Sequence, residues 1–586
     1  VVAAVGTLAV LAILNYLPSL GGNIEVVQEI TYWFSISGKA NQMIDGLICS
    51  EDLFYFFIVI GLFLSLSVLK LHSERKVISK SRCIVTCIGI LTFVLLLEYV
   101  CTRPACMWYC DVTQDKSRTL SKGSQEVMKA LDGGLTITTY VNLLDDHRWQ
   151  GLPANRVYDV RGFRQFTRFK PEIQMRYVYY YDQTDNPILD KLYPNLSMEE
   201  RARELARVED LDFDKFLSPE EIREKIDLTS EGNRFVRLLE RENGRKTFLR
   251  IYNDGQANPG EREIAAALKR LTIVPPKVGF LTGHDERSIR QVGEWDYSAF
   301  AANIGFRYSL VNIGFDVEEV DLRDTIPGDI HVLVIADLKK PLTDDEQEYL
   351  QRYVDKGGNL FILATATRQE LLNPVTRSLG VYFEPGILVQ NHKQHQQDLI
   401  LGEITSEAIH FSPEFFSNKA SGKCITMPRA VAINCNGQSD FRITPILETS
   451  AKGCWNEQET IDFVNQVATL GPGEQEKSYP LMVMLDREVG SKKQYILVVG
   501  CADCISNGEL TRTRNDVNSN NYSLIMESFR VLGDGVFPVD VSRPAPVDNA
   551  IKIGETGLIV LKWFALFILP LGIVMGGVWV WRRRRK

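Results

Sequence analysis

The chain has 586 residues, with 74 acidic and 66 basic side chains and a formal net charge of −8 at pH 7. A net negative charge with no basic stripe in the large polar region argues against nucleic acid as a partner. That region, about 450 residues long, exceeds one average domain, so we expect two or three folded units.

Four apolar segments flank the polar region, at residues 1–17, 53–69, 84–100 and 557–581. Each is close to the ~20 residues that a helix needs to cross a bilayer. The first segment has neither the basic region nor the small-residue cleavage site of a signal peptide. Because it also starts without Met, we expect the chain to be cut from a longer protein. The sequence therefore predicts four membrane spans, with a buried core helix as the alternative for the first.

Two runs of positive charge set the orientation of these spans. The run between the second and third spans comprises Lys70, His72, Arg75, Lys76, Lys80 and Arg82, and the other run occupies residues 582–586. Lys and Arg beside membrane spans remain on the cytoplasmic side. We therefore predict that both runs lie inside and that residues 104–548 and the loop 21–52 lie outside.

The first part of the external region, residues 104–272, mixes extended and helical patterns. Apolar–polar alternation indicates strands, and charged segments that follow capping residues indicate helices. The predicted strands are 135–143, 177–181 and 248–252, and the predicted helices are 198–208, 219–239 and 261–271. This region is predicted to be one α/β domain.

The second part, residues 273–548, alternates short apolar strands with helices. This order predicts a parallel, doubly wound sheet. The predicted strands are 277–281, 315–320, 330–335 and 360–363, and the predicted helices are 297–313 with an interruption near Gly305, 343–354 and 519–531. A hairpin is predicted near the end, with strands 479–486 and 494–500 joined at Gly490.

One motif at the end of a predicted strand, Gly283-His284-Asp285-Glu286, offers a candidate site. Ligands of open α/β sheets bind at the carboxyl ends of strands, and a His beside two carboxylates suits acid–base chemistry, a metal or a partner. An ordinary turn followed by a helix start is the alternative.

Eleven cysteines occur, five of them in the second half of the external region. An external compartment permits disulfides, but an odd number leaves at least one free or paired elsewhere. Cys501 and Cys504 have the CxxC spacing of a redox pair or half a zinc site. No second CxxC accompanies them, so buried or disulfide-bonded cysteines are the alternative.

Two further pairs of polar residues have a functional and a simpler explanation. His392 and His395 have a spacing that suits metal binding from a helix, or they belong to a solvated loop. Glu98 and Lys562 lie in otherwise apolar spans about one turn from the external end, where charges are costly and often paired. They form an intramembrane pair, or each reaches the interface independently.

Many residues of the second domain follow a known pattern: Val278, Gly279, Phe280, Leu281, Thr282, Gly283, His284, Asp285, Glu286, Asp316, Val317, Asp321, Leu322, Ile326, Pro327, Asp329, Leu333, Val334, Ile335, Pro341, Leu342, Thr343, Glu346, Tyr353, Gly357, Gly358 and Leu360. With them the chain resembles the ectodomain of GldG-type proteins, auxiliary subunits of ABC transporters associated with gliding motility. The resemblance implies a central domain similar to the GIFT domain of intraflagellar-transport proteins, with a class I glutamine-amidotransferase-like fold. An amidotransferase needs a Cys on a sharp turn after a strand, whereas residues 364–367 contain neither Cys nor Ser.

Two flanking signatures extend the resemblance over residues 104–586. A juxtamembrane signature contains Asp111, Val112, Thr113, Lys116, Thr119, Leu120 and Ser121, and a strand end contains Gly500, Asp503, Ser506 and Asn507. Tyr109 replaces an Arg of the family, and Cys501 and Cys504 are further departures.

The first hundred residues resemble the tail of GldF-type ABC permeases. The matching residues are Gly46, Ile48, Ser50, Asp52, Tyr55 and Phe56, and Cys49 and Glu51 depart from the pattern. Residues 1–103 therefore resemble the end of a permease that is fused to its auxiliary subunit.

These resemblances imply a non-catalytic subunit without cofactors, in the inner membrane with a large periplasmic domain. No P-loop sequence occurs in the chain, so ATP hydrolysis is expected in a separate, GldA-like ATPase. The other expected partners are the permease, membrane lipids, envelope or motility proteins and a second copy of the chain. The alternatives are a structural anchor of an envelope machine without transport and an extracytoplasmic hydrolase.

Overall fold

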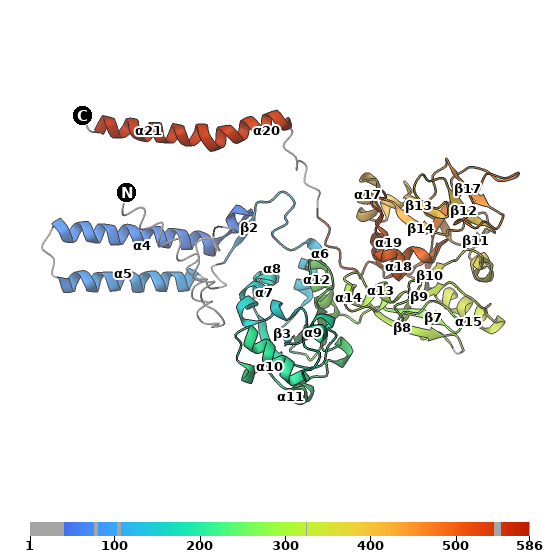
Figure 1. The fold of residues 1–586 in the computed structure, drawn as a ribbon, viewed down its shortest axis with the longest axis horizontal. Coiled ribbons are helices and arrows are strands. Elements are labelled where there is room, and N and C mark those ends of the chain that lie inside the picture. The colour runs from blue at the N-terminus through green and yellow to red at the C-terminus, as the bar shows by residue number, and fades with distance from the viewer. Residues whose placement is uncertain are drawn as a thin grey trace.

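The computed structural model describes residues 40–584 except 41, 76–79, 102, 104–106, 324 and 544–552. Apolar helices lie at one end of the molecule and two α/β units at the other (Figure 1). The fold is therefore mixed α/β with membrane-length helices at both ends of the chain.

Three helices are long and apolar enough to cross a bilayer: Ser50–Arg75, Ser81–Cys101 and Gly554–Arg584, with mean hydropathies of 2.3, 2.4 and 2.4. They correspond to α4 (Ser50–Arg75), α5 (Lys80–Cys101) and the continuous α20 (Gly554–Trp563) and α21 (Leu569–Arg584), which a π-helical turn joins. The described chain thus has three candidate spans where four were predicted. The fourth prediction, residues 1–17, lies outside the described residues.

A short ribbon joins the start of α4 to the segment that follows α5. Strand β1 (Leu47–Cys49) pairs antiparallel with β2 (Tyr109–Asp111). The start of α4 and the end of α5 therefore lie on one side, while the basic end of α4, with Lys70 and Arg75, lies on the other. The start of α4 and the end of α5 thus connect to the rest of the chain on the same side of this helix pair.

The first α/β unit contains a four-stranded sheet in the order β4-β3-β5-β6. Strands β3 and β4 are parallel, and β5 and β6 are antiparallel to their neighbours. The strands are β3 (Leu135–Asn142), β4 (Ile173–Tyr180), β5 (Val236–Arg241) and β6 (Lys246–Arg250). The helices are α6 (Lys122–Ala130), α7 (Arg156–Gly162), α8 (Arg164–Phe169), α9 (Pro187–Leu192), α10 (Met198–Val208), α11 (Pro219–Lys225) and α12 (Glu261–Arg270).

The predicted helix 219–239 is wrong in its second half. Helix α11 ends at Lys225, and the chain then turns through Gly232, whose φ of 65° is left-handed. Strand β5 starts at Val236 and pairs with β3. Its first four residues are buried, Arg237 among them, and a run that is covered on both faces favours a central strand over a helix with one exposed face.

The second unit is built on a nine-stranded sheet in the order β14-β13-β16-β18-β19-β10-β9-β7-β8. Five strands, β8-β7-β9-β10-β19, are parallel, and the other four extend the sheet antiparallel. The strands are β7 (Lys277–Thr282), β8 (Asp316–Asp321), β9 (Ile330–Ala336), β10 (Asn359–Leu363), β13 (Leu399–Ile404), β14 (Ile425–Pro428), β16 (Arg442–Glu448), β18 (Pro480–Val489) and β19 (Lys492–Val499). Two small ribbons pair β11 (Tyr382–Phe383) with β15 (Ile433–Asn434) and β12 (Ile387–Gln390) with β17 (Cys454–Glu457). The sheet is thus mixed, although its first half is parallel as predicted.

Helices pack on both faces of the parallel strands. One face carries α12, α13, α14 and α19 around Phe280 and Phe361, and the other carries α15 and α16 around Leu333 and Leu360. The helices are α13 (Ser298–Ala301), α14 (Leu310–Ile313), α15 (Asp344–Asp355), α16 (Asn373–Ser378), α17 (Pro413–Ala420), α18 (Asn507–Thr511) and α19 (Asn521–Leu532). Strand β10 is buried at all five positions, as expected for a sheet that is covered on both sides.

The predicted helix 297–313 is interrupted around Gly305, as expected, but only one turn remains on each side, α13 and α14. The side chain of Asn312 donates hydrogen bonds to the carbonyls of Ile304 and Phe306, at 3.1 and 2.9 Å. These bonds satisfy loop carbonyls that helix formation would otherwise use. The hairpin predicted around Gly490 is present as β18 and β19.

Arg543 ties the segment that leaves the two α/β units to the segment that enters them. Its guanidinium contacts the Glu261 carboxylate at 2.5 Å and the Thr119 carbonyl at 2.7 Å, and it also donates to the Lys116 carbonyl. Glu261 accepts the Ser121 backbone N–H at 2.6 Å. We call this group the juxtamembrane clamp; it fixes residues of the predicted juxtamembrane signature beside the tail that leads to α20.

We expect Arg543→Met to lower the unfolding free energy by about 2 kcal/mol, because hydrogen bonds to charged groups contribute roughly 1.5–3 kcal/mol. The thermal midpoint of the full chain in nanodiscs measures the effect. Arg512→Met is the matched control, since Arg512 pairs with Glu294 at side chains that are 52% and 64% exposed, where pairs contribute about 0–1 kcal/mol. Equal midpoints for the two variants would contradict a stabilising clamp.

Candidate functional site

The strand order of the second sheet reverses between β7 and β9. Strand β7 is followed in sequence by its neighbour β8 on one side, and then by β9, β10 and β19 on the other. Ligands of open α/β sheets bind at the carboxyl ends of the strands beside such a reversal. The loops after these strands therefore form the candidate site.

A buried ion-pair cluster occupies this edge, centred on Arg287. Its guanidinium contacts Asp337 at 3.1 Å, Asp503, the Thr365 hydroxyl at 3.3 Å and the Trp295 carbonyl at 2.9 Å. The side chains of Arg287, Asp337 and Asp503 are only 4–5% exposed. The loops after β7, β9, β10 and β19 are thus held together by one side chain, and its loss would leave two buried carboxylates.

The charges of the cluster balance within the protein. Arg368 contacts Asp337 from the opposite side at 2.6 Å. Burial opposes the charge of Arg287, but nearby Tyr297, Asp503 and Asp337 outweigh burial and raise its pKa. Arg287 therefore remains a cation. A residue that is fully engaged in this way positions loops; it is not arranged as an acid or base.

The side chains of the predicted motif Gly283–Glu286 point in two directions at this edge. His284 and Glu286 point inward, with the His284 Nδ1 atom 3.1 Å from Glu286 and the Nε2 atom 3.1 Å from Glu346. Asp285 has a left-handed φ of 59° and pairs with Lys340 at 2.8 Å, with its side chain 60% exposed. A hydrogen bond from Lys340 lowers the pKa of Asp285.

His284 connects the β7 loop to the start of α15. Its partner Glu346 also accepts the Thr343 backbone N–H and hydroxyl, at 2.7 and 2.8 Å. Burial raises the pKa of Glu346, but the bonds from Thr343 and His284 outweigh burial and the net pKa is lowered. With both ring nitrogens beside carboxylates, the imidazole is placed as a bridge between two elements, and no helix starts at Asp285 as the alternative required.

The cysteine and histidine pairs have separate structural roles. Cys501 and Cys504 are free and buried, and burial raises the pKa of Cys501 well above 9, which disfavours a reactive thiolate. The Nε2 atom of His392 lies 2.6 Å from the Leu399 carbonyl, whereas His395 contacts Asp516 at 2.9 Å. The geometry thus matches the simpler explanation of each pair.

Sequence reasoning missed one group of possible metal ligands, which follows β3. Ligand atoms of Asp145, Asp146 and His147 lie within 4.8 Å of one another. However, Asp145 already accepts the backbone N–H groups of His147 and Phe235, at 2.6 and 3.0 Å. These bonds account for the buried carboxylate by shaping the loop.

A polar cavity of about 390 Å³ lies beside the Arg287 cluster, and we call it the carboxyl-edge pocket. Trp295 and Asp503 belong both to its wall and to the cluster. The other lining residues are Glu294, Gln394, His395, Gln396, Asp398, Leu399, Pro428, Arg429, Ser506, Gly508, Glu509, Arg512 and Arg514. Its wall includes residues of the loops after β7 and β19. The pocket therefore lies on the carboxyl side of the parallel strands, where open α/β sheets bind ligands.

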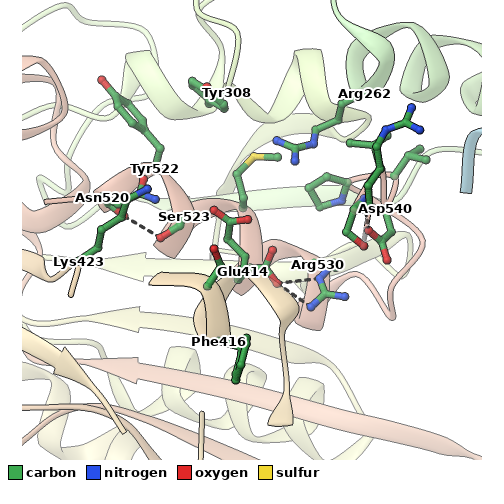
Figure 2. A pocket seen from close by; sticks show the side chains of 18 of the residues that line it. Arg262, Tyr308, Glu414, Phe416, Lys423, Asn520, Tyr522, Ser523, Arg530 and Asp540 are labelled. Atoms are coloured by element: carbon green, nitrogen blue, oxygen red, sulfur yellow. Dashed lines mark hydrogen bonds and ion pairs between the residues drawn. The ribbon is translucent and has the colours of Figure 1, made fainter. Parts of the chain in front are cut away.

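A larger groove of about 940 Å³ lies between α17, α19 and the outgoing tail. Figure 2 shows Tyr308 and Tyr522 toward one end and Asp540 toward the other. The two tyrosine rings stack with centroids 5.1 Å apart, and Arg530 pairs with Glu527 at 2.6 Å. Because Asp540 belongs to the tail, the wall of this groove depends on the juxtamembrane clamp.

The predicted intramembrane pair spans two helices. Glu98 lies in α5 and Lys562 lies in α20, each in the part of its helix that is nearer the external region. Their pairing stays a prediction.

Comparison with known proteins supports a transport role. Residues 275–528 match a family described as an ABC-type uncharacterized transport system. This match covers the parallel strands, the Arg287 cluster and the carboxyl-edge pocket. It supports an accessory role in ABC-type transport, which implies ATPase and permease partners in general.

Other comparisons add no functional argument. No curated protein matches the chain. Among solved structures, the mmIFT52 N-terminal domain is 14% identical over 44% of this chain and 98% of its own, with a TM-score of 0.31. A putative thua-like protein from Parabacteroides merdae is 11% identical over 42% of this chain and 95% of its own, with a TM-score of 0.23. At these scores the similarity supports no conclusion about this chain.

We expect Glu346→Gln to destabilise the protein at pH 7 by about 1–2 kcal/mol, because a charge-assisted bond is lost. The lowered pKa of Glu346 means that its stabilising effect is complete above its ordinary value of 4.5 and is lost as the pH falls through the lower folded-state value. The difference from wild type should therefore be constant above about pH 5 and shrink as the pH falls below 4.5.

Thermal midpoints of the full chain across this range provide the measurement. Glu348→Gln, on the same helix but with a side chain that is 59% exposed, reports the general effect of acid. A constant Glu346→Gln difference at all pH values would show that the carboxylate charge does not matter.

Proposed function

We propose that this chain is a membrane-anchored auxiliary subunit of an ABC-type transporter, with a large periplasmic part that binds a partner or substrate. The family match over residues 275–528 is the observation that carries the proposal. The three apolar helices support it, because they anchor this region at both ends. ATP hydrolysis is assigned to a separate ATPase.

The finer assignment is to GldG-type subunits of a system associated with gliding motility, with a GIFT-type, amidotransferase-like second domain. The juxtamembrane signature supports this assignment through its part in the clamp. The carbonyls of Lys116 and Thr119 accept from Arg543, and the Ser121 hydroxyl accepts the Ser124 N–H at the start of α6, at 3.3 Å. The residues of the signature thus have structural roles in the clamp and at the start of α6.

Fusion to the end of a GldF-type permease is the second part of the assignment. Strand β1 lies in the permease-like region and pairs with β2 of the auxiliary region. Arg164 of α8 contacts Glu51 at 3.4 Å, and Arg168 donates to Gln42 at 2.6 Å. The two regions therefore share one interface, as expected for parts that work as a unit.

A non-catalytic role fits the geometry of the sheet edge. Arg287 is fully engaged, His284 lies between two carboxylates, and the turn after β10 presents Thr365 to Arg287. We propose that the loops at this edge present a binding surface and that the complex contains two copies of the chain. The inner membrane is the proposed location.

Co-purification tests the transporter proposal. A tagged full chain, expressed from its own locus, should bring down an ABC ATPase and a permease after extraction. The isolated chain should hydrolyse no ATP, because it has no P-loop, and activity should appear when the ATPase is added. Recovery of envelope structural proteins without any ATPase would favour the anchor alternative instead.

Cysteine labelling of intact cells tests the orientation. Ser491→Cys, in the β18–β19 turn, should react with a membrane-impermeant reagent, whereas Glu74→Cys, at the end of α4, should react only after permeabilisation. Both variants carry Cys110→Ser, because native Cys110 is exposed near the membrane. Labelling of Glu74→Cys and protection of Ser491→Cys in intact cells would reverse the orientation.

A further inference from the structure

The carboxyl-edge pocket has walls that are held in place before any ligand arrives. Arg287 donates to the Trp295 carbonyl at 2.9 Å and also contacts Asp503. One buried side chain thus fixes two walls that are 208 positions apart in the chain. Such preorganisation lowers the entropic cost of binding, which distinguishes this pocket from an incidental surface hollow.

The charged groups of the pocket are largely paired with one another. Arg514 makes two bonds to Glu509, at 2.6 and 3.0 Å, and Arg512 contacts Glu294 at 3.3 Å. The lining carboxylates are Glu294, Asp398, Asp503 and Glu509, and the lining guanidiniums are Arg429, Arg512 and Arg514, with Arg287 behind Asp503. Balanced charge favours a neutral ligand, because an anion or a cation would have to break these pairs.

Several polar groups retain hydrogen-bonding capacity toward a neutral ligand. The carboxyl group of Asp398 and the guanidinium of Arg429 belong to half-buried residues that line the pocket. Burial raises the pKa of Asp398, whose carbonyl accepts the Arg429 backbone N–H at 2.8 Å. A carboxylate accepts hydrogen bonds and a guanidinium donates them. The pocket therefore offers both an acceptor and a donor to the hydroxyl groups of a ligand.

Trp295 lines the same pocket and remains exposed to solvent. The residue is 55% exposed although it belongs to the wall of a cavity. An indole ring presents a large apolar face together with one N–H donor. A pyranose ring has a matching C–H face and hydroxyl groups around its edge, and a cavity of about 390 Å³ holds a small saccharide.

We propose that the carboxyl-edge pocket binds a neutral saccharide, with Trp295 stacking on the sugar ring and Asp398 and Arg429 bonding its hydroxyl groups. This inference deepens the proposed function and rests on it, since it names the substrate or partner class of the external region. Arg287 acts as a positioning residue.

Saturation-transfer NMR on the full chain in nanodiscs tests the proposal without interference from glycoside detergents. The probes are glucose, mannose, galactose, N-acetylglucosamine and their β-1,4-linked dimers, with the dipeptide alanyl-alanine as a zwitterionic comparison. We expect at least one saccharide to bind and the dipeptide not to bind. Trp295→Ala should weaken binding at least about tenfold, and Trp295→Phe should restore part of it.

Trp149→Ala is the matched control, because Trp149 is 54% exposed and lies in the first unit; its binding should equal wild type. Absence of saccharide binding at millimolar concentration, unchanged binding in Trp295→Ala, or preference for the dipeptide would overturn the proposal. ATPase co-purification with Trp295→Ala separates the two proposals. Lost saccharide binding with intact ATPase recovery is expected, whereas wild-type chain that binds saccharide but recovers no ATPase contradicts only the transporter assignment.

Discussion

The contact of Arg543 with Glu261 is the constraint on which the arrangement of this protein depends. The chain enters the two α/β units from α5 and leaves them toward α20, and these two connections are more than 400 residues apart in sequence. Arg543 brings them together by bonding the incoming segment at two carbonyls. Gly123 tightens the junction further, because a Cβ there would lie 2.2 Å from the Asp540 carbonyl oxygen. Both connections therefore emerge from one place on the folded unit.

A second electrostatic centre organises the far side of the molecule. Arg287 joins the loops after four parallel strands, and its partners Asp337 and Asp503 are as buried as the apolar core. Buried ion pairs are weak evidence for added stability, so the cluster is better understood as a device that fixes loop positions. The carboxyl-edge pocket and the His284 bridge both lie against loops that this cluster holds.

Much of the fold could be predicted from the sequence because its strands are short apolar runs that are buried on both faces. Strands β7, β9 and β10 appear within one residue of the predicted ends. The second half of helix 219–239 was wrong, and the helical parts of 297–313 are shorter than predicted, because charge pattern and local propensity do not record tertiary contacts. In the first case β3 draws residues 236–241 into a sheet, and in the second Asn312 stabilises an irregular loop.

The site was less predictable for a related reason. His284 and Glu286 could be proposed because they are adjacent in a motif at a strand end. Arg287 is the next residue, yet its partners lie 50 and 216 positions away, and no local pattern joins them. The only local signal was the position of Asp337 and Asp503 just after apolar strands, which is typical of ligand edges in α/β sheets.

The ribbon of β1 and β2 gives the α4–α5 hairpin a mechanical role. Helix α4 has 26 residues, which corresponds to roughly 39 Å at 1.5 Å per residue. Its outer end is stitched to the end of α5 and to α8 through Arg164, so the hairpin cannot swivel freely against the external region. A tilt of the hairpin at its basic end is therefore transmitted through these contacts to the first α/β unit.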